Sequence, residues 1–157
     1  MTTRETDPAP VVLRPAERAD LLDVYRLEQR CFPSPWPYQA FLAHLDAPAF
    51  LLALVDSEIV GYIVADIRDG FPGPAGHIKD LAVAPDHRRT GIGSRLLDAG
   101  LARLENAGAV YVSLEVREGN EAAQALYRAF GFSAERTETG YYADGTDAVV
   151  MSRQLDR

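Results

Sequence analysis

Arg88-Arg89-Thr90-Gly91-Ile92-Gly93-Ser94 is the most informative segment of this sequence. It follows an apolar, strand-like run at residues 77–84 and opens a helical pattern whose apolar positions are Ile92, Leu96, Leu97, Leu101 and Leu104. The first turn of such a helix has unpaired backbone N–H groups and the positive end of the helix dipole. Its two glycines let an anion approach the backbone without a Cβ in the way, and its two arginines add positive charge. The stretch therefore predicts a diphosphate-binding turn between a strand and a helix.

Two other phosphate-binding motifs are excluded by the same residues. A P-loop needs Gly-Lys followed by Ser or Thr, and the turn contains no lysine. A dinucleotide fingerprint needs a third glycine, and residue 96 is a leucine. Taken alone, the two glycines could serve only to start the helix tightly, so the surrounding sequence has to decide.

Hydrophobic periodicity on both sides of this turn predicts alternating strands and helices. Asp20 caps a first helix, Pro33-Ser34-Pro35-Trp36-Pro37 interrupts the helical pattern, and Asp56-Ser57-Glu58 forms a hairpin turn. The predicted strands span residues 11–14, 50–55, 59–67, 77–84, 110–116, 133–139 and 148–155, and the predicted helices span residues 20–32, 38–45, 91–107 and 121–130. The order β-α-α-β-β-β-α-β-α-β-β predicts an α/β fold whose mixed sheet carries helices on both faces.

Length and composition bound the domain organisation and the partners. With 157 residues, of which 47% are hydrophobic, the chain fits one domain, which we expect over residues 11–155 after a flexible tail at residues 1–10. The net charge of −7 disfavours binding to a nucleic-acid backbone. No apolar run approaches the roughly 18 residues of a membrane span. We therefore expect a cytoplasmic protein with no membrane or direct nucleic-acid partner.

The few cysteine and histidine residues predict no metal centre. Cys31 is the single cysteine, so an internal disulfide is excluded, and its place on the apolar face of a predicted helix indicates packing. His44, His77 and His87 are scattered along the chain and do not form a cluster of ligands. We expect no metal ion in this protein.

With its flanks, the glycine turn resembles the acetyl-CoA motif of the GNAT superfamily of N-acetyltransferases. The motif reads Arg88-x-x-Gly91-x-Gly93 here, follows Leu81-Ala82-Val83-Ala84-Pro85, and belongs to a resemblance over about residues 11–155. Within the superfamily the chain resembles the RimI-type protein N-terminal acetyltransferases, in the segments Leu114-Glu115-Val116-Arg117, Asn120, Ala125-Leu126-Tyr127, Phe130-Gly131-Phe132 and Tyr141-Tyr142. The resemblance implies a GNAT fold, a single domain with a splayed central mixed sheet.

Two positions depart from the RimI pattern. Arg88 stands where RimI proteins often have glutamine, which the wider superfamily pattern accepts. His77-Ile78-Lys79-Asp80 is similar to the archaeal and eukaryotic N-terminal acetyltransferases instead. These departures leave the exact substrate class open.

The resemblance implies acetyl-CoA as the cosubstrate and assigns residues to it. Backbone groups of residues 81–83 would pair with the pantetheine arm, amides of residues 89–94 would hold the pyrophosphate, and Asn120 would lie near the thiol. The full set is Leu81, Ala82, Val83, Arg88, Arg89, Thr90, Gly91, Ile92, Gly93, Ser94, Asn120 and Tyr127.

Transfer of an acetyl group to an amine requires a base, because an ammonium cannot attack a thioester. Glu115, near the end of a strand beside the cofactor strand, is the first candidate, and a surface carboxylate paired with Arg117 is the alternative interpretation. His77 is the rival base or a partner of Glu115. Asp80 is a weaker candidate, because strict alternation along the strand turns it away from the side of His77 and Lys79.

The departing thiolate needs an acid, and Tyr127 is the candidate. It follows Glu115 by twelve residues, which places it in the next predicted helix, from where its hydroxyl could return toward the sheet. The RimI resemblance implies the same role. The alternative is that Tyr127 packs in the core beside Leu126 and Phe130, with its hydroxyl bonded to a backbone carbonyl.

Aromatic residues supply the candidate acceptor site. Tyr141 and Tyr142, with Phe32 and Trp36, are the predicted substrate-binding residues, and the prolines at positions 33–37 would stiffen the opposite wall. Since N-terminal acetyltransferases have a matching tyrosine pair, the resemblance implies a protein or peptide N-terminus as substrate, with ribosomal proteins as one candidate class. A small-molecule amine as the acceptor and a non-catalytic acyl-CoA-binding module are the alternatives. The sequence leaves open whether the protein is a monomer or a homodimer.

Overall fold

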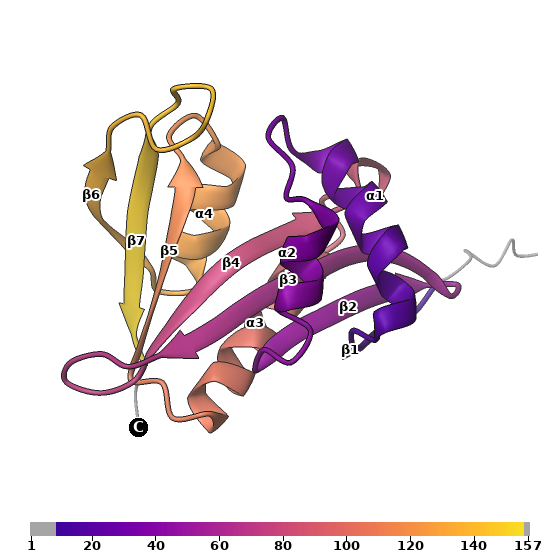
Figure 1. Cartoon of the computed structure of the whole chain (residues 1–157), viewed down its shortest axis with the longest axis horizontal. Coiled ribbons are helices and arrows are strands. Elements are labelled where there is room, and N and C mark those ends of the chain that lie inside the picture. The colour runs from indigo at the N-terminus through magenta and orange to yellow at the C-terminus, as the bar shows by residue number, and fades with distance from the viewer. Residues whose placement is uncertain (1–8, 156–157) are drawn as a thin grey trace, which may run out of the picture.

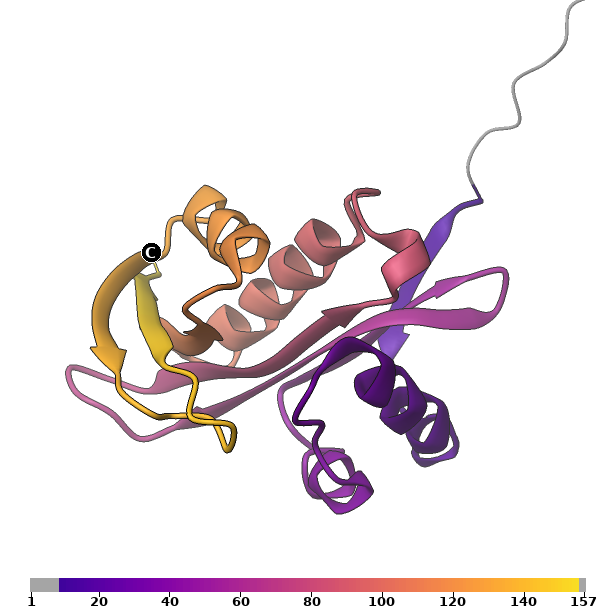
Figure 2. The ribbon, with the colours of Figure 1, turned by 90° about the horizontal axis from the view of Figure 1, so that it is seen from above.

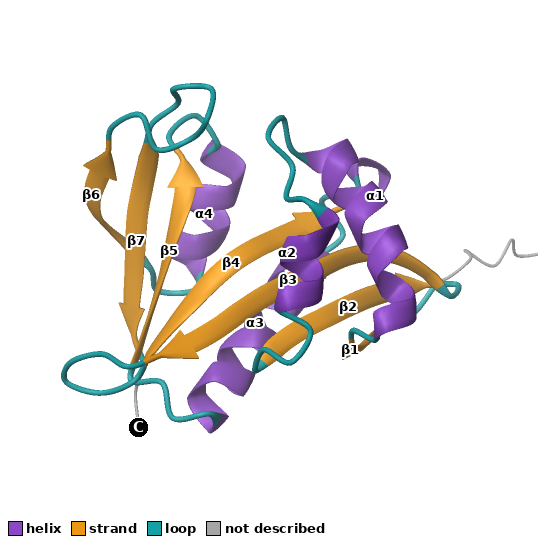
Figure 3. Ribbon diagram, viewed as in Figure 1, coloured by secondary structure: helices purple, strands orange, loops and turns teal. Residues whose placement is uncertain are grey.

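The computed structural model describes residues 9–155 and has one seven-stranded sheet, in the order β1-β2-β3-β4-β5-β7-β6 (Figure 1). Its strands are β1 (Val11–Pro15), β2 (Ala49–Val55), β3 (Glu58–Arg68), β4 (Ala75–Val83), β5 (Tyr111–Arg117), β6 (Ser133–Glu138) and β7 (Ala148–Gln154). Its helices are α1 (Leu21–Cys31), α2 (Tyr38–Ala43), α3 (Ile92–Asn106) and α4 (Glu121–Ala129), with short 3-10 turns at Arg18–Asp20 and Pro85–His87. β4 and β5 pair in parallel and the other neighbours pair antiparallel. The predicted element order and mixed sheet are confirmed (Figure 3).

The helices cover the two faces of the sheet. α1 and α2 lie on one side, and α3 and α4 lie on the other (Figure 2). α3 buries the apolar stripe that the sequence predicts, namely Ile92, Leu96, Leu97, Leu101 and Leu104. It approaches β3 so closely that a Cβ on Gly100 would lie 2.7 Å from Cδ1 of Ile63. A side chain at position 100 would have to displace the end of Ile63, so the glycine lets α3 lie close to the sheet.

The sheet opens between β4 and β5. Their parallel pairing begins at Ala75 with Tyr111 and stops at Ile78 with Leu114, after which the two strands diverge (Figure 1). Residues 79–83 of β4 have no partner strand on this side among residues 9–155, although β3 pairs with the other side. The predicted splayed sheet is thus present, with one edge of β4 facing the gap.

A β-bulge in β4 changes which residues face this gap. Asp80 pairs with Val64 of β3 and Ile78 pairs with the next residue, Ala65, so Lys79 is an extra residue in β4. The expectation from strict alternation is therefore wrong: the bulge shifts the phase of the strand, and Asp80 faces the side of α1 as Lys79 does. The reason for ranking Asp80 below His77 as a base disappears with this correction.

Local features agree with the sequence in most places. Phe32, which precedes Pro33, is extended and ends α1. The β2–β3 turn consists of Asp56 and Ser57 alone, both with positive φ, since Glu58 already belongs to β3. Asp20 is not the predicted side-chain cap of α1, because its carboxylate accepts hydrogen bonds from Arg14 and from the backbone N–H of Glu17.

Two expectations concern the ends of the chain and its surroundings. The predicted flexible tail falls almost wholly outside the described residues, and of residues 1–10 only Ala9 and Pro10 are described. None of the helices within residues 9–155 is long and apolar enough to cross a membrane.

Candidate active site

A pocket lies where β4 and β5 diverge. Its walls come from both faces of the sheet, since the α1–α2 connection and α4 both contribute to it. The predicted residues that line it are Phe32, Trp36, Leu81, Glu115, Asn120, Tyr127 and Tyr142. Residues predicted separately for the acceptor, the chemistry and the thiol end of acetyl-CoA therefore meet in one place.

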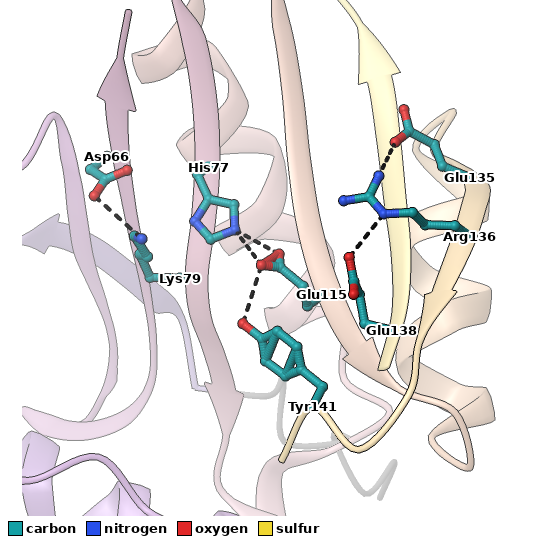
Figure 4. A network of polar contacts seen from close by, with 8 residues as sticks. All are labelled: Asp66, His77, Lys79, Glu115, Glu135, Arg136, Glu138 and Tyr141. Atoms are coloured by element: carbon teal, nitrogen blue, oxygen red, sulfur yellow. Dashed lines mark hydrogen bonds and ion pairs between the residues drawn. The ribbon is translucent and has the colours of Figure 1, made fainter. Parts of the chain in front are cut away.

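Glu115 is held by two side chains on the side of the sheet that α4 does not cover (Figure 4). Nε2 of His77 lies 2.6 Å from Oε2 and 3.0 Å from Oε1 of Glu115, and the hydroxyl of Tyr141 donates to Oε1 at 3.2 Å. His77 pairs with Ser113 just before the end of the parallel β4–β5 ladder, and Glu115 directly follows Leu114, the last paired residue of β5. The two rival bases of the sequence analysis thus form one hydrogen-bonded pair, and Glu115 does not pair with Arg117.

The surroundings of Glu115 decide its charge. Burial alone would raise its pKa, but the hydrogen bonds from His77 and Tyr141 and the charges of His77 and Lys79 outweigh burial and lower the pKa below its usual range. Glu115 is therefore a carboxylate at neutral pH. Nδ1 of His77 is enclosed and lacks a hydrogen-bond partner among the described residues. The pair can accept a proton on Glu115 and stabilise it through His77.

Tyr127 of α4 is one of the buried residues that line the pocket. The side chain is 7% exposed and its ring meets that of Phe132 edge-on at a centroid distance of 5.8 Å. Its hydroxyl forms no hydrogen bond within residues 9–155, in contrast to the backbone bond that the packing interpretation expects. Burial raises the pKa of Tyr127 well above its usual value, so the hydroxyl keeps its proton until a strong base is nearby.

The two adjacent tyrosines both lie near Glu115 but differ in their surroundings. Tyr142 lines the pocket beneath Arg117, whose guanidinium carbon lies 4.1 Å from the ring centroid, and Asp144 holds that guanidinium at 2.9 Å. Tyr141 is half exposed and lies outside the pocket, 4.9 Å from Tyr142 between ring centroids. Of the four predicted substrate residues, Tyr141 alone does not line this pocket, and it is connected to the site by its hydrogen bond to Glu115.

The glycine turn fits a diphosphate. Gly91 is the N-cap of α3 with φ +82°, no side chain caps the helix, and a Cβ at Gly91 would have no atom within 4 Å. Amides of residues 90–94 donate no hydrogen bond within the described chain, so they are free for an anion. Arg88 is turned toward the strand, since its Nε donates to the carbonyl of Val83 at 3.1 Å. The turn thus leads from the open edge of β4 to the N-terminus of α3.

The other predicted cofactor residues divide between side chain and backbone. Ala82 is 4% exposed, so only its backbone can contribute. Asn120 uses its side-chain oxygen to cap α4 by accepting from the N–H of Ala123 at 3.1 Å. That contact leaves the side-chain NH₂ of Asn120 as the group available at the pocket.

Glu28 is a buried charged residue of the pocket that the sequence analysis did not assign to the site. Glu28 is 2% exposed on α1, where it interrupts the apolar face formed by Val24 and Leu27. Its Oε2 accepts the backbone N–H of Trp36 at 2.8 Å. A charged residue on the buried face of a helix was the available signal, because such a group needs partners in the core.

Cys31 is half buried, and burial raises the pKa of its thiol above the usual value. Its Sγ contacts the carbonyl of Val83 at 3.6 Å, which agrees with a packing role. Within residues 9–155 no three His, Cys, Asp or Glu side chains come together as metal ligands.

Comparisons with known proteins agree with this geometry. The family described as "Acetyltransferase (GNAT) family" matches residues 21–132. An N-alpha-acetyltransferase of Saccharolobus solfataricus is 37% identical over 154 residues, which cover 91% of this chain and 92% of the relative.

Two solved structures share the fold along almost the whole chain. The ribosomal-protein-S18-alanine N-acetyltransferase from Escherichia coli has a TM-score of 0.80 and 27% identity, with 94% of this chain and 96% of that chain covered. Arabidopsis thaliana Naa50 in complex with the bisubstrate analogue CoA-Ac-MVNAL has a TM-score of 0.83 and 26% identity, with 92% of this chain and 99% of that chain covered. The chain therefore belongs to the GNAT family of acetyltransferases and is an acetyl-CoA-dependent N-acyltransferase.

Proposed function

We propose that this enzyme transfers the acetyl group of acetyl-CoA to the α-amine of a protein or peptide N-terminus. The observation that carries the proposal is the position of Glu115, which His77 and Tyr141 hold at the point where the acceptor wall and the open edge of β4 meet. The relative from Saccharolobus solfataricus is named as an N-alpha-acetyltransferase, and the Naa50 structure contains an analogue that joins CoA to a peptide.

The cosubstrate is expected to bind along two adjoining features. Free amides of residues 90–94 would hold its pyrophosphate at the N-terminus of α3, where the helix dipole favours negative charge. The unpaired edge of residues 81–83 would bond the pantetheine arm as a further strand does. The thioester would then lie in the pocket between Glu115 and Tyr127.

The acceptor amine has to lose a proton before it attacks. An α-amine has a pKa of about 8, against about 10.4 for a lysine side chain. At neutral pH a carboxylate can therefore deprotonate an α-amine more easily than it can a lysine side chain. Glu115 takes this proton, directly or through a water, and His77 stabilises the protonated carboxyl group. The amine nitrogen then bonds to the thioester carbon, the carbon–sulfur bond breaks, and Tyr127 gives its proton to the thiolate.

The acceptor class follows from the walls of the pocket. Phe32, Trp36 and Tyr142 form an apolar and aromatic entrance suited to the first residues of a peptide inserted amino end first. Ribosomal proteins are a candidate substrate class, because the structural neighbour from Escherichia coli is named for one. Acetyl-CoA and new protein N-termini meet in the cytoplasm, which is the compartment that this proposal implies.

A small-molecule amine is the competing acceptor, and one experiment separates the two. The enzyme is incubated with acetyl-CoA and a peptide library in which each sequence has a free or a blocked N-terminus and an internal lysine. Mass spectrometry should locate the acetyl group on the free α-amine, and the matched blocked peptides should stay unmodified. Higher kcat/KM for spermidine or an aminoglycoside than for every peptide would contradict the proposal.

A further inference from the structure

Two carboxyl groups that line the pocket lie together, and neither belongs to the proposed acid–base chemistry. Glu28 of α1 is buried, and its two oxygens accept hydrogen bonds from the backbone N–H of Trp36 at 2.8 Å and from the hydroxyl of Tyr62. Asp80, which the bulge in β4 turns to this side, lines the same pocket as Glu28, and the two carboxyl groups interact there. The carboxyl groups thus face each other between α1 and the strand that leads to the cosubstrate.

No cation among the described residues offsets a double negative charge here. Lys79, next in sequence, points to Asp66 at 3.8 Å, and Arg117 is held by Asp144. Oδ2 of Asp80 is enclosed and has no hydrogen-bond donor within residues 9–155. Two ionised carboxylates in contact without a counter-charge are costly in a buried site, so the arrangement requires a proton between them.

Asp80 is the member of the pair that holds the proton. Both oxygens of Glu28 already accept a hydrogen bond from another group, whereas the enclosed oxygen of Asp80 has no partner within residues 9–155 and is free to carry a proton. Burial, followed by the contact with Glu28, raises the pKa of Asp80 well above its usual value. A protonated Asp80 can donate its O–H to Glu28, which turns an unsatisfied contact into a hydrogen bond.

We propose that protonated Asp80 is a positioning residue, which holds the acceptor-binding segment at residues 32–36 against the cofactor strand by donating a hydrogen bond to Glu28. Glu28 then joins three parts of the site: the acceptor wall through Trp36, β3 through Tyr62 and β4 through Asp80. Because Asp80 directly precedes Leu81, the pair connects the acceptor wall to the edge that we assign to the pantetheine arm.

The proposal rests on the proposed function, and it differs from a role of Asp80 as general base. A base has to be ionised to work, whereas this role requires the proton to stay on Asp80 throughout the reaction. Loss of that proton would place two like charges in contact and loosen the acceptor wall. The titratable or charged groups around the pair are Cys31 on α1, Tyr62 on β3, Lys79 on β4, Arg88 beyond β4, Glu115 on β5, Tyr127 on α4 and Tyr142 after β6.

Kinetics of two Asp80 variants separate the two roles. Asp80→Ala removes the donor, and we expect the KM for peptide to rise by roughly tenfold or more, the effect of a lost buried hydrogen bond, with the Kd for acetyl-CoA unchanged. Asp80→Asn keeps a neutral donor of the same shape, so it should restore the peptide KM to within about twofold of wild type. A kcat reduced by about a hundredfold in Asp80→Asn, as expected for loss of a general base, would overturn the proposal. Wild-type behaviour of Asp80→Ala would overturn it as well.

Two measurements test the pair without any turnover, so they remain valid if the acceptor proves to be a small amine. The side-chain carboxyl ¹³C resonance of Asp80, assigned by its loss in Asp80→Asn, should show the protonated form at pH 7, and an ionised signal would overturn the proposal.

Trp36 is the only tryptophan, and its fluorescence reports on the acceptor wall. It should change more in Asp80→Ala than in Asp80→Asn. Equal spectra for the two variants would count against the proposal.

Discussion

At the scale of single residues, the site depends on how one carboxylate is held. The carboxylate of Glu115 is hydrogen-bonded to His77 and to Tyr141, and these contacts keep it ionised despite partial burial. Under the proposed function, an ionised Glu115 would attract the ammonium form of the acceptor as well as accept its proton, so one residue would both bind the acceptor and prepare it for attack.

Replacing Glu115 by Gln should slow turnover in a pH-dependent way. The amide cannot accept a proton, so we expect kcat to fall by about a hundredfold below pH 8, where the α-amine is mostly protonated. Above that pH the amine deprotonates by itself and the deficit should shrink. Acetyl-CoA affinity, measured by calorimetry, should be unchanged. A deficit that is the same at all pH values would transfer the role of base to His77 or to water.

Replacing Tyr127 by Phe removes only the proton donor and keeps the ring that packs against Phe132. The variant should fold and bind acetyl-CoA like wild type, and kcat should fall by at least about tenfold, since general acid catalysis contributes roughly 10²- to 10⁴-fold. The rate is measured where chemistry, and not product release, is limiting. Wild-type turnover in a folded variant would leave Tyr127 as a packing residue and solvent as the acid.

Some of these residues could be predicted from the sequence and others could not. Glu115 and Tyr127 were found because they belong to segments that resemble a known family, and the structure brings them to the same pocket. The contact between His77 and Glu115 depends on the register in which β4 and β5 pair, and the residue pattern within either strand does not determine this register. Asp80 was placed on the wrong face because a bulge is decided by pairing with β3, and no residue type marks it in β4.

At the scale of elements, the helix that follows the glycine turn was the most predictable part. α3 begins at Ile92 and ends at Asn106, within one residue of the predicted range, because its apolar stripe and its flanking glycines agree. α2 ends at Ala43, two residues earlier than predicted, since periodicity carries little information in so short a helix. Strand boundaries shifted by one or two residues where pairing extended them, as at Ala75 in β4.

The two ends of α3 provide a matched test of the diphosphate turn. Gly91 and Gly108 flank the helix, both have positive φ, and a Cβ at either position would have no atom within 4 Å. Replacement of either by Ala should cost a similar stability, about 1 kcal/mol, because a side chain is strained in this conformation. Only Gly91→Ala should weaken acetyl-CoA binding in calorimetry, whereas binding of a pantetheine fragment without the pyrophosphate should be little affected. Equal acetyl-CoA affinity in both variants would contradict the assignment.

At the scale of the whole molecule, the buried carboxyl pair should make stability depend on pH. The native state keeps the proton on Asp80, whereas the unfolded chain loses it near pH 3.9, the ordinary value for aspartate. Above that pH the unfolded state binds fewer protons, so the free energy of unfolding falls as pH rises, until Asp80 ionises in the native state too. Asp80→Asn should remove this part of the slope, and the difference in Tm between variant and wild type should move in favour of the variant from pH 5 to pH 8. Parallel curves would contradict a retained proton.

The extra residue at Lys79 reverses the alternation of side chains along β4. Before Lys79, odd-numbered residues such as His77 face the side of Glu115. After Lys79, even-numbered residues such as Asp80 face this side, where Asp80 meets Glu28. The same step also selects which amides and carbonyls of residues 81–83 point into the gap between the strands, because backbone polar groups alternate together with side chains.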